Sequence, residues 1–274
     1  MTVDPRSSTV AKVFDLVADT YDDVGVPWFG PIAQGLVDVL RPKPGETALD
    51  VGCGKGAATF LLADRVRPDG HVIGVDLSEG MLAQARRLAE QRGVTVDWRL
   101  ADALDPGLAP GSVDLVASSL VLFFLPDPRQ ALQAWRTIVR DGGRVAATTF
   151  GRFDPAIDTL GDLLDPYLPP QSLDARAPVE DQPFASDAGV ERMFAGAGLL
   201  DVVTTHLAVE ARLTSVEHWR EWSKSLGQRA MWEKVPAEEL PGLMAAAGEI
   251  YDAHADSAGV LVTSNDIRVT LGRR

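Results

Sequence analysis

The chain is poor in cysteine, with a single one, Cys53, among 274 residues. One thiol excludes an internal disulfide framework and favours a reducing compartment. The sequence also lacks an apolar run long enough to cross a bilayer, and its first residues lack the apolar segment of a signal peptide. We therefore expect a cytoplasmic protein that does not insert into a membrane.

Basic side chains are also scarce, because 26 lysines and arginines stand against 39 aspartates and glutamates, which leaves a net charge of −13. This charge repels phosphate backbones and anionic lipids, so we expect no nucleic-acid partner. The four histidines have no metal-ligand partner at helical spacing, so no metal site is expected. A hydrophobic content of 46% is sufficient for a full core.

The most informative segment is residues 49–56, Leu-Asp-Val-Gly-Cys-Gly-Lys-Gly. A short apolar run ends here in a carboxylate and alternating glycines, which predicts a buried strand and then a turn through conformations that glycine adopts at low cost. Residues 57–63 have the composition of a helix with an apolar stripe. Strand, turn and helix together are typical of a βα unit that binds a nucleotide.

Further predicted strands carry polar residues at their ends. Asp76 lies twenty positions after Gly56, where a carboxylate can accept hydrogen bonds from the hydroxyls of a ribose. Because open α/β sheets bind ligands at the carboxyl ends of their strands, we expect these polar residues to surround one cleft. The predicted strands and their polar ends are 71–76 with Asp76, 94–100 with Asp102, and 113–117 with Ser118 and Ser119.

With these motifs the chain resembles the class I S-adenosylmethionine-dependent methyltransferases, and in particular the small-molecule group that includes ubiquinone and menaquinone biosynthesis methyltransferases. The resemblance implies an α/β, Rossmann-like fold with a mostly parallel seven-stranded sheet, helices on both faces and a helical cap. It also implies S-adenosyl-L-methionine as the cofactor. The matching motifs lie within about residues 45–150, at 48–54, 74–82, 101–103, 114–120 with 125–128, and 141–145.

The resemblance assigns one group of residues to the methionine end of the cofactor. Asp50 and the backbone of Gly52 and Gly54 would lie near the cationic amino group. Cys53 would be part of the turn, and Ser118 would contribute its carbonyl.

A second group would contact the nucleoside. Asp76 would accept hydrogen bonds from the ribose hydroxyls, while Leu77 and Met81 pack on adenine and ribose. Asp102 would accept a hydrogen bond from the adenine amino group, and the amide of Ala103 would meet a ring nitrogen. The alternative interpretation is that these aspartates only stabilise loops or cap helix N-termini.

Apolar spacing and turn residues divide the chain into three expected parts. Tyr21 lies between two predicted N-terminal helices, where the resemblance implies a contact to the methionine end and the alternative is a packing aromatic. The proline-rich stretch at 167–183 is expected to form a long loop. The expected parts are an N-terminal helical lid at 1–44, a cofactor-binding core at 45–150, and a segment at 151–274 that completes the sheet and carries a helical cap at about 212–256.

Apolar periodicity also predicts the remaining elements. They are helices at 8–18, 30–40, 186–196, 215–226 and 237–254, a helix beginning at 128, and strands at 144–150, 199–209 and 260–271.

The aromatic residues outside the predicted nucleotide core include Trp28, Phe29, Trp219, Trp222 and Trp232. They favour an aromatic or polyketide-like acceptor that is methylated on oxygen or carbon, although helix packing explains each of them equally well.

A sulfonium methyl is already activated, so the protein must align the acceptor, exclude water and in some cases remove a proton. Histidine is suited to that last task near neutral pH, and His218 on the expected cap is the candidate base. The alternative is a histidine packed within the cap.

Two other functions remain open from the sequence. A nicotinamide-nucleotide oxidoreductase would use the same βα unit and Asp76, although its glycine turn usually follows an apolar residue rather than a carboxylate such as Asp50. A methyltransferase-fold protein with a structural cofactor would instead use the cap pocket for cyclisation or ligand binding.

Overall fold

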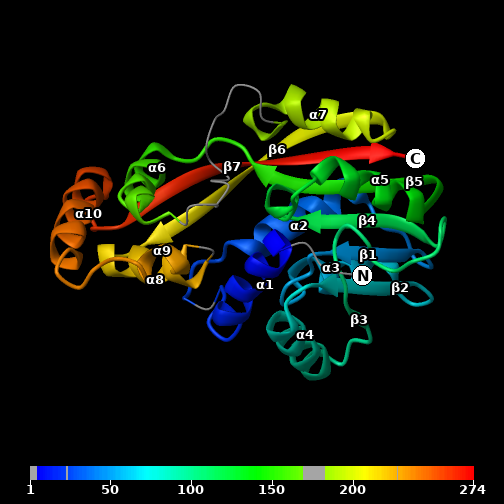
Figure 1. Cartoon of the computed structure of the whole chain (residues 1–274), viewed down its shortest axis with the longest axis horizontal. Coiled ribbons are helices and arrows are strands. Elements are labelled where there is room, and N and C mark those ends of the chain that lie inside the picture. The colour runs from blue at the N-terminus through cyan, green and yellow to red at the C-terminus, as the bar shows by residue number, and fades with distance from the viewer. Residues whose placement is uncertain (1–4, 23, 169–182, 227) are drawn as a thin grey trace.

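The chain folds around one seven-stranded sheet in a computed structural model that describes residues 5–22, 24–168, 183–226 and 228–274 (Figure 1). The strand order is β3-β2-β1-β4-β5-β7-β6. Neighbouring strands are parallel except that β7 runs antiparallel to both β5 and β6. The strands are β1 (Thr47–Val51), β2 (His71–Asp76), β3 (Asp97–Leu100), β4 (Val113–Ser119), β5 (Val139–Phe150), β6 (Leu200–Leu213) and β7 (Leu261–Arg273). This arrangement confirms the predicted mostly parallel, Rossmann-like sheet.

Helices cover both faces of the sheet. The helices are α1 (Pro5–Val17), α2 (Phe29–Leu40), α3 (Ala57–Val66), α4 (Glu79–Arg92), α5 (Pro128–Ile138), α6 (Pro155–Asp162), α7 (Asp187–Gly196), α8 (Val216–Ser225), α9 (Arg229–Trp232) and α10 (Leu240–His254), and the short 3₁₀ segments are η1 (Leu122–Phe124), η2 (Asp165–Tyr167) and η3 (Pro183–Ala185). None of the helices in these described ranges is both long and apolar enough to span a bilayer.

Successive strand residues pack on opposite faces, as the two-residue period of a strand requires. In β1, Leu49 and Val51 belong to a buried cluster with α5 and α7. Ala48, between them in the alternation, packs with α2 and α3 on the other face. The single acidic residue of this strand, Asp50, therefore shares the α2–α3 face with Ala48.

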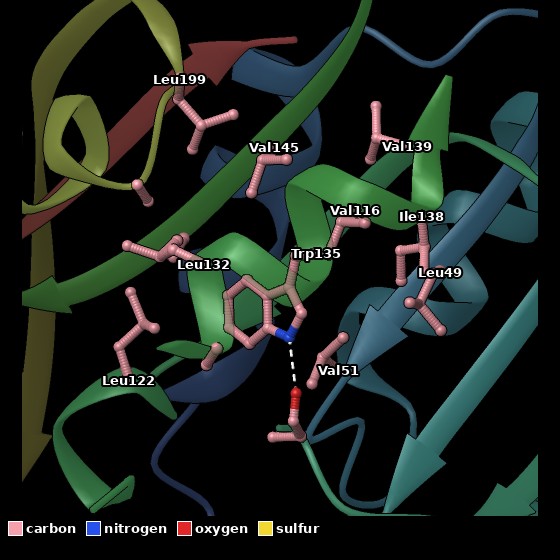
Figure 2. Packing of buried hydrophobic residues seen from close by; sticks show 14 of the residues in the cluster. Leu49, Val51, Val116, Leu122, Leu132, Trp135, Ile138, Val139, Val145 and Leu199 are labelled. Atoms are coloured by element: carbon pink, nitrogen blue, oxygen red, sulfur yellow. Dashed lines mark hydrogen bonds between the residues drawn. The ribbon is translucent and has the colours of Figure 1, made fainter. Parts of the chain in front are cut away.

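Trp135 of α5 is fully buried at the centre of the first of these clusters (Figure 2). Its indole nitrogen donates a hydrogen bond of 2.7 Å to the carbonyl of Ala103, in the loop that follows β3. This bond joins the helix packed under the sheet to a loop at the carboxyl edge, so the core holds the loop in place.

Helix starts coincide with side-chain caps that the sequence contains. At the start of α4, the hydroxyl of Ser78 accepts a hydrogen bond from the Met81 amide. At the start of α5, which opens with Pro128, the carboxylate of Asp127 accepts from the Gln130 amide. Each cap satisfies a backbone donor that has no partner within its helix. The predicted cap of α7 is confirmed, because Ser186 accepts from the Gly189 amide.

The long strands β6 and β7 extend beyond the rest of the sheet, and α6, α8, α9 and α10 gather around their far ends (Figure 1). Trp219, Trp222 and Trp232 are buried in the apolar cluster formed there. Trp28 belongs to the same cluster and meets Trp222 edge to face at 5.4 Å between ring centroids. The helical segment thus has an apolar core of its own, joined to the N-terminal segment through Trp28.

Several predicted boundaries need correction. The expected strand at 94–100 begins only at Asp97, because Gly93 ends α4 in a left-handed conformation and the Val94 amide still bonds back to Ala89. Helix α6 was not predicted, although its Asp154 cap and Pro155 start are a recognisable signal. Most of the expected loop at 167–183 lies outside the described residues, which stop at 168 and resume at 183.

Replacing Trp135 by Phe is expected to destabilise the protein through the lost bond to the Ala103 carbonyl. A buried carbonyl without a partner costs about 1–3 kcal/mol, in addition to the packing lost with the smaller ring. Urea unfolding measures this loss directly. The control is Ile138→Val on the same helix, which removes packing alone and is expected to cost about 0.5–1.5 kcal/mol. Equal losses in the two variants would contradict the role given to the hydrogen bond.

Candidate active site

The turn after β1 runs through glycines with positive φ, and two of them have distinct reasons for lacking a side chain. At Gly52, with φ of 67°, a Cβ would come within 2.4 Å of the Val121 side chain. At Gly54, with φ of 52°, a Cβ would meet nothing within 4 Å. Gly52 therefore lets β1 and the segment after β4 approach closely, whereas Gly54 leaves open space above the turn.

Asp76, the last residue of β2, connects this turn to α4. One carboxylate oxygen accepts from the Gly54 amide at 2.8 Å, and the other accepts from the Ser78 amide at 2.9 Å. Burial raises the pKa of Asp76 above its ordinary value, whereas the hydrogen bonds from these amides lower it. Since a carboxylate has about four acceptor positions and the Leu77 amide also acts on this one, acceptor capacity remains for a further donor.

Asp50 is only 1% exposed. One of its oxygens accepts from the Thr59 hydroxyl of α3 at 2.6 Å, and the other is buried without a hydrogen-bond partner. Burial raises the pKa of Asp50 to about 7, and the neighbouring negative charge of Asp76 adds to the effect. A buried carboxylate oxygen with no partner is a costly arrangement that a bound cation would relieve.

A cavity of about 380 Å³ lies above these residues, at the carboxyl ends of the strands. This volume is within the range of small-molecule sites. The predicted site residues that line it are Tyr21, Asp50, Gly52, Cys53, Gly54, Asp76, Leu77, Met81 and Ala103. The structure therefore brings nine of the predicted residues together around one space.

Aromatic rings also line the cavity, and six of them form two connected rows. Phe14 of α1 meets Tyr21 edge to face, and Tyr21 stacks on Phe29 at 4.8 Å between centroids. On the side of the sheet, Phe123 packs on Phe124 at 4.7 Å and on Phe150 at 5.0 Å. The rows meet where Phe14 touches Phe124 at 5.5 Å, and all six rings line the cavity.

Lys55 holds the N-terminal segment against the glycine turn. Its ammonium group donates a 2.6 Å hydrogen bond to the backbone carbonyl of Tyr21, and both residues line the cavity. Burial raises the pKa of the Tyr21 phenol well above its ordinary value, with smaller contributions from Asp22 and Asp76. Tyr21 is therefore neutral at physiological pH and a hydrogen-bond donor rather than a base.

Two predicted cofactor contacts do not line the cavity. The carboxylate of Asp102 accepts from the Leu104 amide at 3.0 Å, which is the loop role named as its alternative. The hydroxyl of Ser118 is buried and donates to the Val51 carbonyl at 3.0 Å. The next residue along β4, Ser119, lines the cavity instead.

His218 is not brought to the cavity. One ring nitrogen lies 2.8 Å from the carbonyl of Val24, and the other lies 3.0 Å from the hydroxyl of Thr214. The geometry therefore corrects the expected position of this side chain, which contacts the N-terminal loop at Val24 rather than the cavity. It matches the alternative of a histidine packed within the helical segment.

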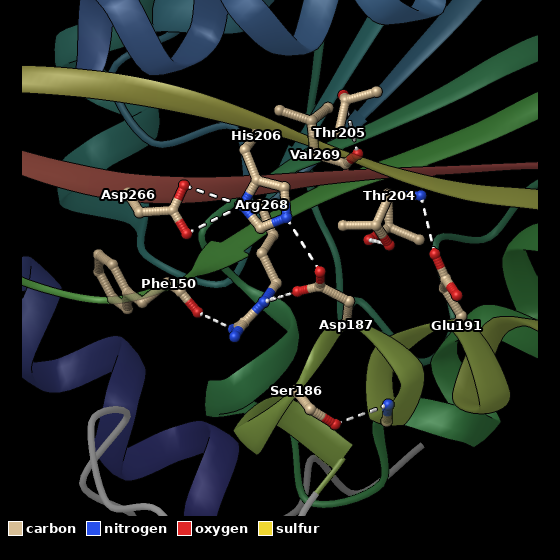
Figure 3. Close-up of polar contacts among 12 residues, drawn as sticks. Phe150, Ser186, Asp187, Glu191, Thr204, Thr205, His206, Asp266, Arg268 and Val269 are labelled. Carbon is tan, nitrogen blue, oxygen red and sulfur yellow. Dashed lines mark hydrogen bonds and ion pairs between the residues drawn. The ribbon is translucent and has the colours of Figure 1, made fainter.

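His206 also lies away from the cavity, in an ion-pair cluster between β6, β7 and the start of α7 (Figure 3). Its two ring nitrogens contact the carboxylates of Asp266 and Asp187, which raise its pKa above the ordinary value. Arg268 binds Asp187 and the backbone carbonyl of Phe150, the last residue of β5. The cluster thus supports the strand end that carries one of the cavity rings.

The aromatic residues outside the nucleotide core divide into two sets. Trp28 and Phe29 line the cavity, whereas Trp219, Trp222 and Trp232 are packed in the core of the helical segment. Of residues 212–256, Leu226 lines the cavity. The three tryptophans are therefore packing residues, as the alternative interpretation held.

The sequence interpretation missed Ser119, Lys55 and Phe150 as lining residues. The signal for Ser119 was available, because alternation from Ala117, which packs on the same face as Ala48, places Ser119 rather than Ser118 on the face of Asp50. In the described part of the chain, no group of three or more potential ligands is placed to hold a metal ion.

Comparison with known proteins identifies the family of the chain. A family model described as a methyltransferase domain matches residues 49–147, which include the glycine turn, Asp76 and the end of β4. Nocamycin O-methyltransferase of Saccharothrix syringae is 33% identical over 275 residues, covering 95% of this chain and 97% of that protein. Aklanonic acid methyltransferase DauC of Streptomyces sp. (strain C5) is 39% identical over 163 residues, covering 59% of this chain and 70% of that protein.

Solved structures share the fold at low identity. The YcgJ protein of Bacillus subtilis aligns with a TM-score of 0.57 and 16% identity, covering 88% of this chain and 97% of that chain. The [4+2]-cyclase SpnF aligns with a TM-score of 0.59 and 15% identity, covering 98% and 97%. Nocamycin O-methyltransferase matches nearly the whole chain, and the domain model matches the predicted motifs. Both agree with the resemblance, and the chain belongs to the S-adenosylmethionine-dependent methyltransferases.

Proposed function

We propose that this methyltransferase transfers the methyl group of S-adenosyl-L-methionine to an oxygen of a small, aromatic or polyketide-like acceptor. The observation that carries the proposal is that one cavity joins the carboxylates Asp50 and Asp76 to two rows of aromatic rings. Oxygen as the methylated atom is supported by the relative whose name is nocamycin O-methyltransferase. When bound, the cofactor supplies a sulfonium-activated methyl group.

The residues present fit the methionine and ribose parts of that cofactor. The oxygen of Asp50 that is buried without a partner suits a cationic amino group. The remaining acceptor capacity of Asp76 suits a hydroxyl of a ribose. Leu77, Met81 and Ala103 supply apolar surface and a backbone amide for the nucleoside.

The N-terminal segment is proposed to close the site as a lid. Val10, Ala11 and Phe14 of α1 line the cavity, and Asp15 of the same helix accepts from the Ser78 hydroxyl at 2.5 Å. Asp15 also accepts from the Gly80 amide at 3.0 Å, so α1 is bound at the start of α4. Such a cover excludes water from the sulfonium, and we propose that Leu226 brings the helical segment into the same cover.

The proposed transfer is tested with methyl-labelled S-adenosyl-L-methionine and a panel of phenolic, quinonoid and polyketide acceptors, read by mass spectrometry. The expected result is a gain of one methyl on an acceptor and an equal yield of S-adenosylhomocysteine. A protein that binds the cofactor but methylates no member of the panel would support the structural-cofactor alternative. The likeness to SpnF shows the fold alone and does not favour that alternative.

Changing Asp76 to Ala is expected to weaken cofactor binding by about tenfold to hundredfold. The reason is that hydrogen bonds to a charged acceptor contribute about 1.5–3 kcal/mol. Isothermal titration calorimetry measures the affinity, and the control is Asp64→Ala, an exposed aspartate of α3 that removes the same charge. Unchanged affinity in the Asp76 variant would overturn its assignment to the ribose.

Changing Asp50 to Asn is expected to stabilise the ligand-free protein at pH 8 and to weaken cofactor binding. The pKa of Asp50 is about 7 in the folded protein against 3.8 ordinarily, so unfolding releases a proton between these values. Folding stability therefore falls as the pH rises from about 4 to 7, by an amount on the order of a few kcal/mol. Asparagine cannot ionise and can still accept from Thr59, so it avoids this penalty.

Thermal unfolding at pH 5 and pH 8 measures the stability effect of the Asp50 change, and calorimetry measures the affinity. The gain in melting temperature should be larger at pH 8 than at pH 5. A variant that is less stable than the parent at pH 8, or that binds the cofactor equally well, would contradict the role given to Asp50.

A further inference from the structure

Ser119 and Thr148 form a hydroxyl pair at the carboxyl ends of β4 and β5. The two residues are register partners in the parallel ladder, so their side chains lie side by side on one face of the sheet. Their hydroxyl oxygens are 3.3 Å apart. Ser119 lines the cavity, whereas Thr148 is fully buried behind it.

The direction of this hydrogen bond follows from counting donors and acceptors. The Thr148 hydroxyl already accepts from the Leu120 amide at 2.9 Å. Its own hydrogen is buried and needs an acceptor, and among the described residues the remaining partner of this hydroxyl is the Ser119 oxygen. Thr148 therefore donates to Ser119, and the Ser119 hydrogen is left to point into the cavity it lines.

The backbone next to this pair is held in an unusual conformation. Leu120 adopts a φ of 58°, in the left-handed region that non-glycine residues rarely occupy. The hydrogen bond from its amide to the Thr148 hydroxyl holds the residue there. Leu120 lies between the end of β4 and the aromatic segment with Phe123 and Phe124. Strain of this kind is concentrated at functional sites.

The surroundings of Ser119 offer few groups that could take a proton. All four histidines lie in the described residues, and none of them lines the cavity. The cavity carboxylates Asp50 and Asp76 are assigned to the proposed cofactor contacts. The Tyr21 phenol stays protonated because burial raises its pKa. The carboxylate of Asp22 is the other acidic group of the lining, and its contribution is tested below.

We propose that Ser119 donates a hydrogen bond to the acceptor, and that the acceptor is a flat aromatic molecule bearing a delocalised oxyanion, either a carboxylate or an acidic enolate. This inference rests on the proposed function. Charge in such an anion is shared by two oxygens, so one can accept from Ser119 while the other remains free to react. A neutral phenol would instead need a base to remove its proton.

The reaction then balances without a protein base. The free oxygen of the acceptor forms the new O–C bond as the C–S bond breaks, and that electron pair goes to sulfur. An anion and a cation become two neutral groups, and no proton is transferred. Thr148 is a positioning residue in this scheme, because it acts only through the orientation of Ser119.

Binding to the protein loaded with sinefungin, a cationic cofactor analogue that transfers no methyl group, tests the proposal apart from turnover. The probes share a naphthalene-sized ring and are 2-naphthoate, 2-hydroxy-1,4-naphthoquinone and 2-naphthol. Wild-type protein should bind one or both of the oxyanions more tightly than 2-naphthol, and the preferred oxyanion identifies the source. Equal or weaker binding of both oxyanions would overturn the proposal.

Ser119→Ala should weaken binding of the preferred oxyanion by about tenfold to hundredfold and binding of 2-naphthol by less than about tenfold. Sinefungin affinity should not change, which shows that the variant is folded. The control is Thr137→Ala, which removes an exposed hydroxyl bonded within α5 and should bind every probe as the parent does. An oxyanion affinity unaffected by Ser119→Ala would refute the assignment.

Thr148→Val should weaken oxyanion binding with sinefungin affinity retained, and Thr148→Ser should restore it. At saturating S-adenosyl-L-methionine, which is proposed to keep Asp50 ionised, the pH dependence of kcat/KM for a carboxylate acceptor should be flat between about pH 6 and 9, in the parent and in Asp22→Asn. A rise with pH that disappears in Asp22→Asn would show Asp22 as a base and overturn the mechanism. If Ser119→Ala weakens oxyanion binding as expected but the parent protein transfers no methyl group to any acceptor, the result would count against the proposed function alone.

Discussion

The site depends on the carboxylate of Asp76, which accepts from the amides of Gly54 and Ser78. One bond orients the glycine turn after β1, and the other orients the start of α4, so two βα units share a single anchor. The Ser78 hydroxyl in turn donates to Asp15, which brings α1 over the same point. Substitutions at Asp76 therefore act on the loop geometry as well as on any ligand, and the exposed Asp64 alone cannot separate the two effects. Measuring unfolding of the variant beside its affinity separates them.

Asp50 shows how the site exchanges stability for binding. A carboxylate that is 1% exposed, with one oxygen unpartnered and a pKa near 7, destabilises the ligand-free protein at the pH where it would have to bind a cation. A hydrophobic residue at the same place would pack between α3 and the sheet without that penalty. The structure keeps the charge at the end of β1, where the cavity opens, and this is the expected pattern for a functional group that costs stability.

The parallel sheet and its loops were largely predictable from the sequence, because they depend on local signals. Glycine turns, strand-end carboxylates and serine caps placed β1, β2 and α7 correctly, since each signal acts within a few residues. Ser119, which the sequence interpretation missed, and His218 show where such local signals are insufficient. Which of two adjacent serines faces a ligand depends on the register with β5, and where an imidazole points depends on the Val24 loop almost two hundred residues away. The tryptophans of α8 and α9 raise the same difficulty, because an amphipathic helix does not specify whether its apolar face meets a ligand or another helix.

The separation of the helical segment from the cavity also bears on specificity. The apolar core around the far ends of β6 and β7 is filled by its own tryptophans and meets the cavity through Trp28 and Leu226. Under the proposed function, acceptor contacts therefore fall mainly to cavity residues carried by the sheet edge and by the N-terminal segment, including Phe123, Phe150 and Phe29. Of these, the sheet-borne rings pack on one another, and Arg268 binds the backbone carbonyl of Phe150, which suits them to hold an acceptor in line with the donor. The N-terminal segment is held at the site by side-chain hydrogen bonds of Lys55 and Asp15, and under the proposed lid role it is the part that opens for exchange of ligands.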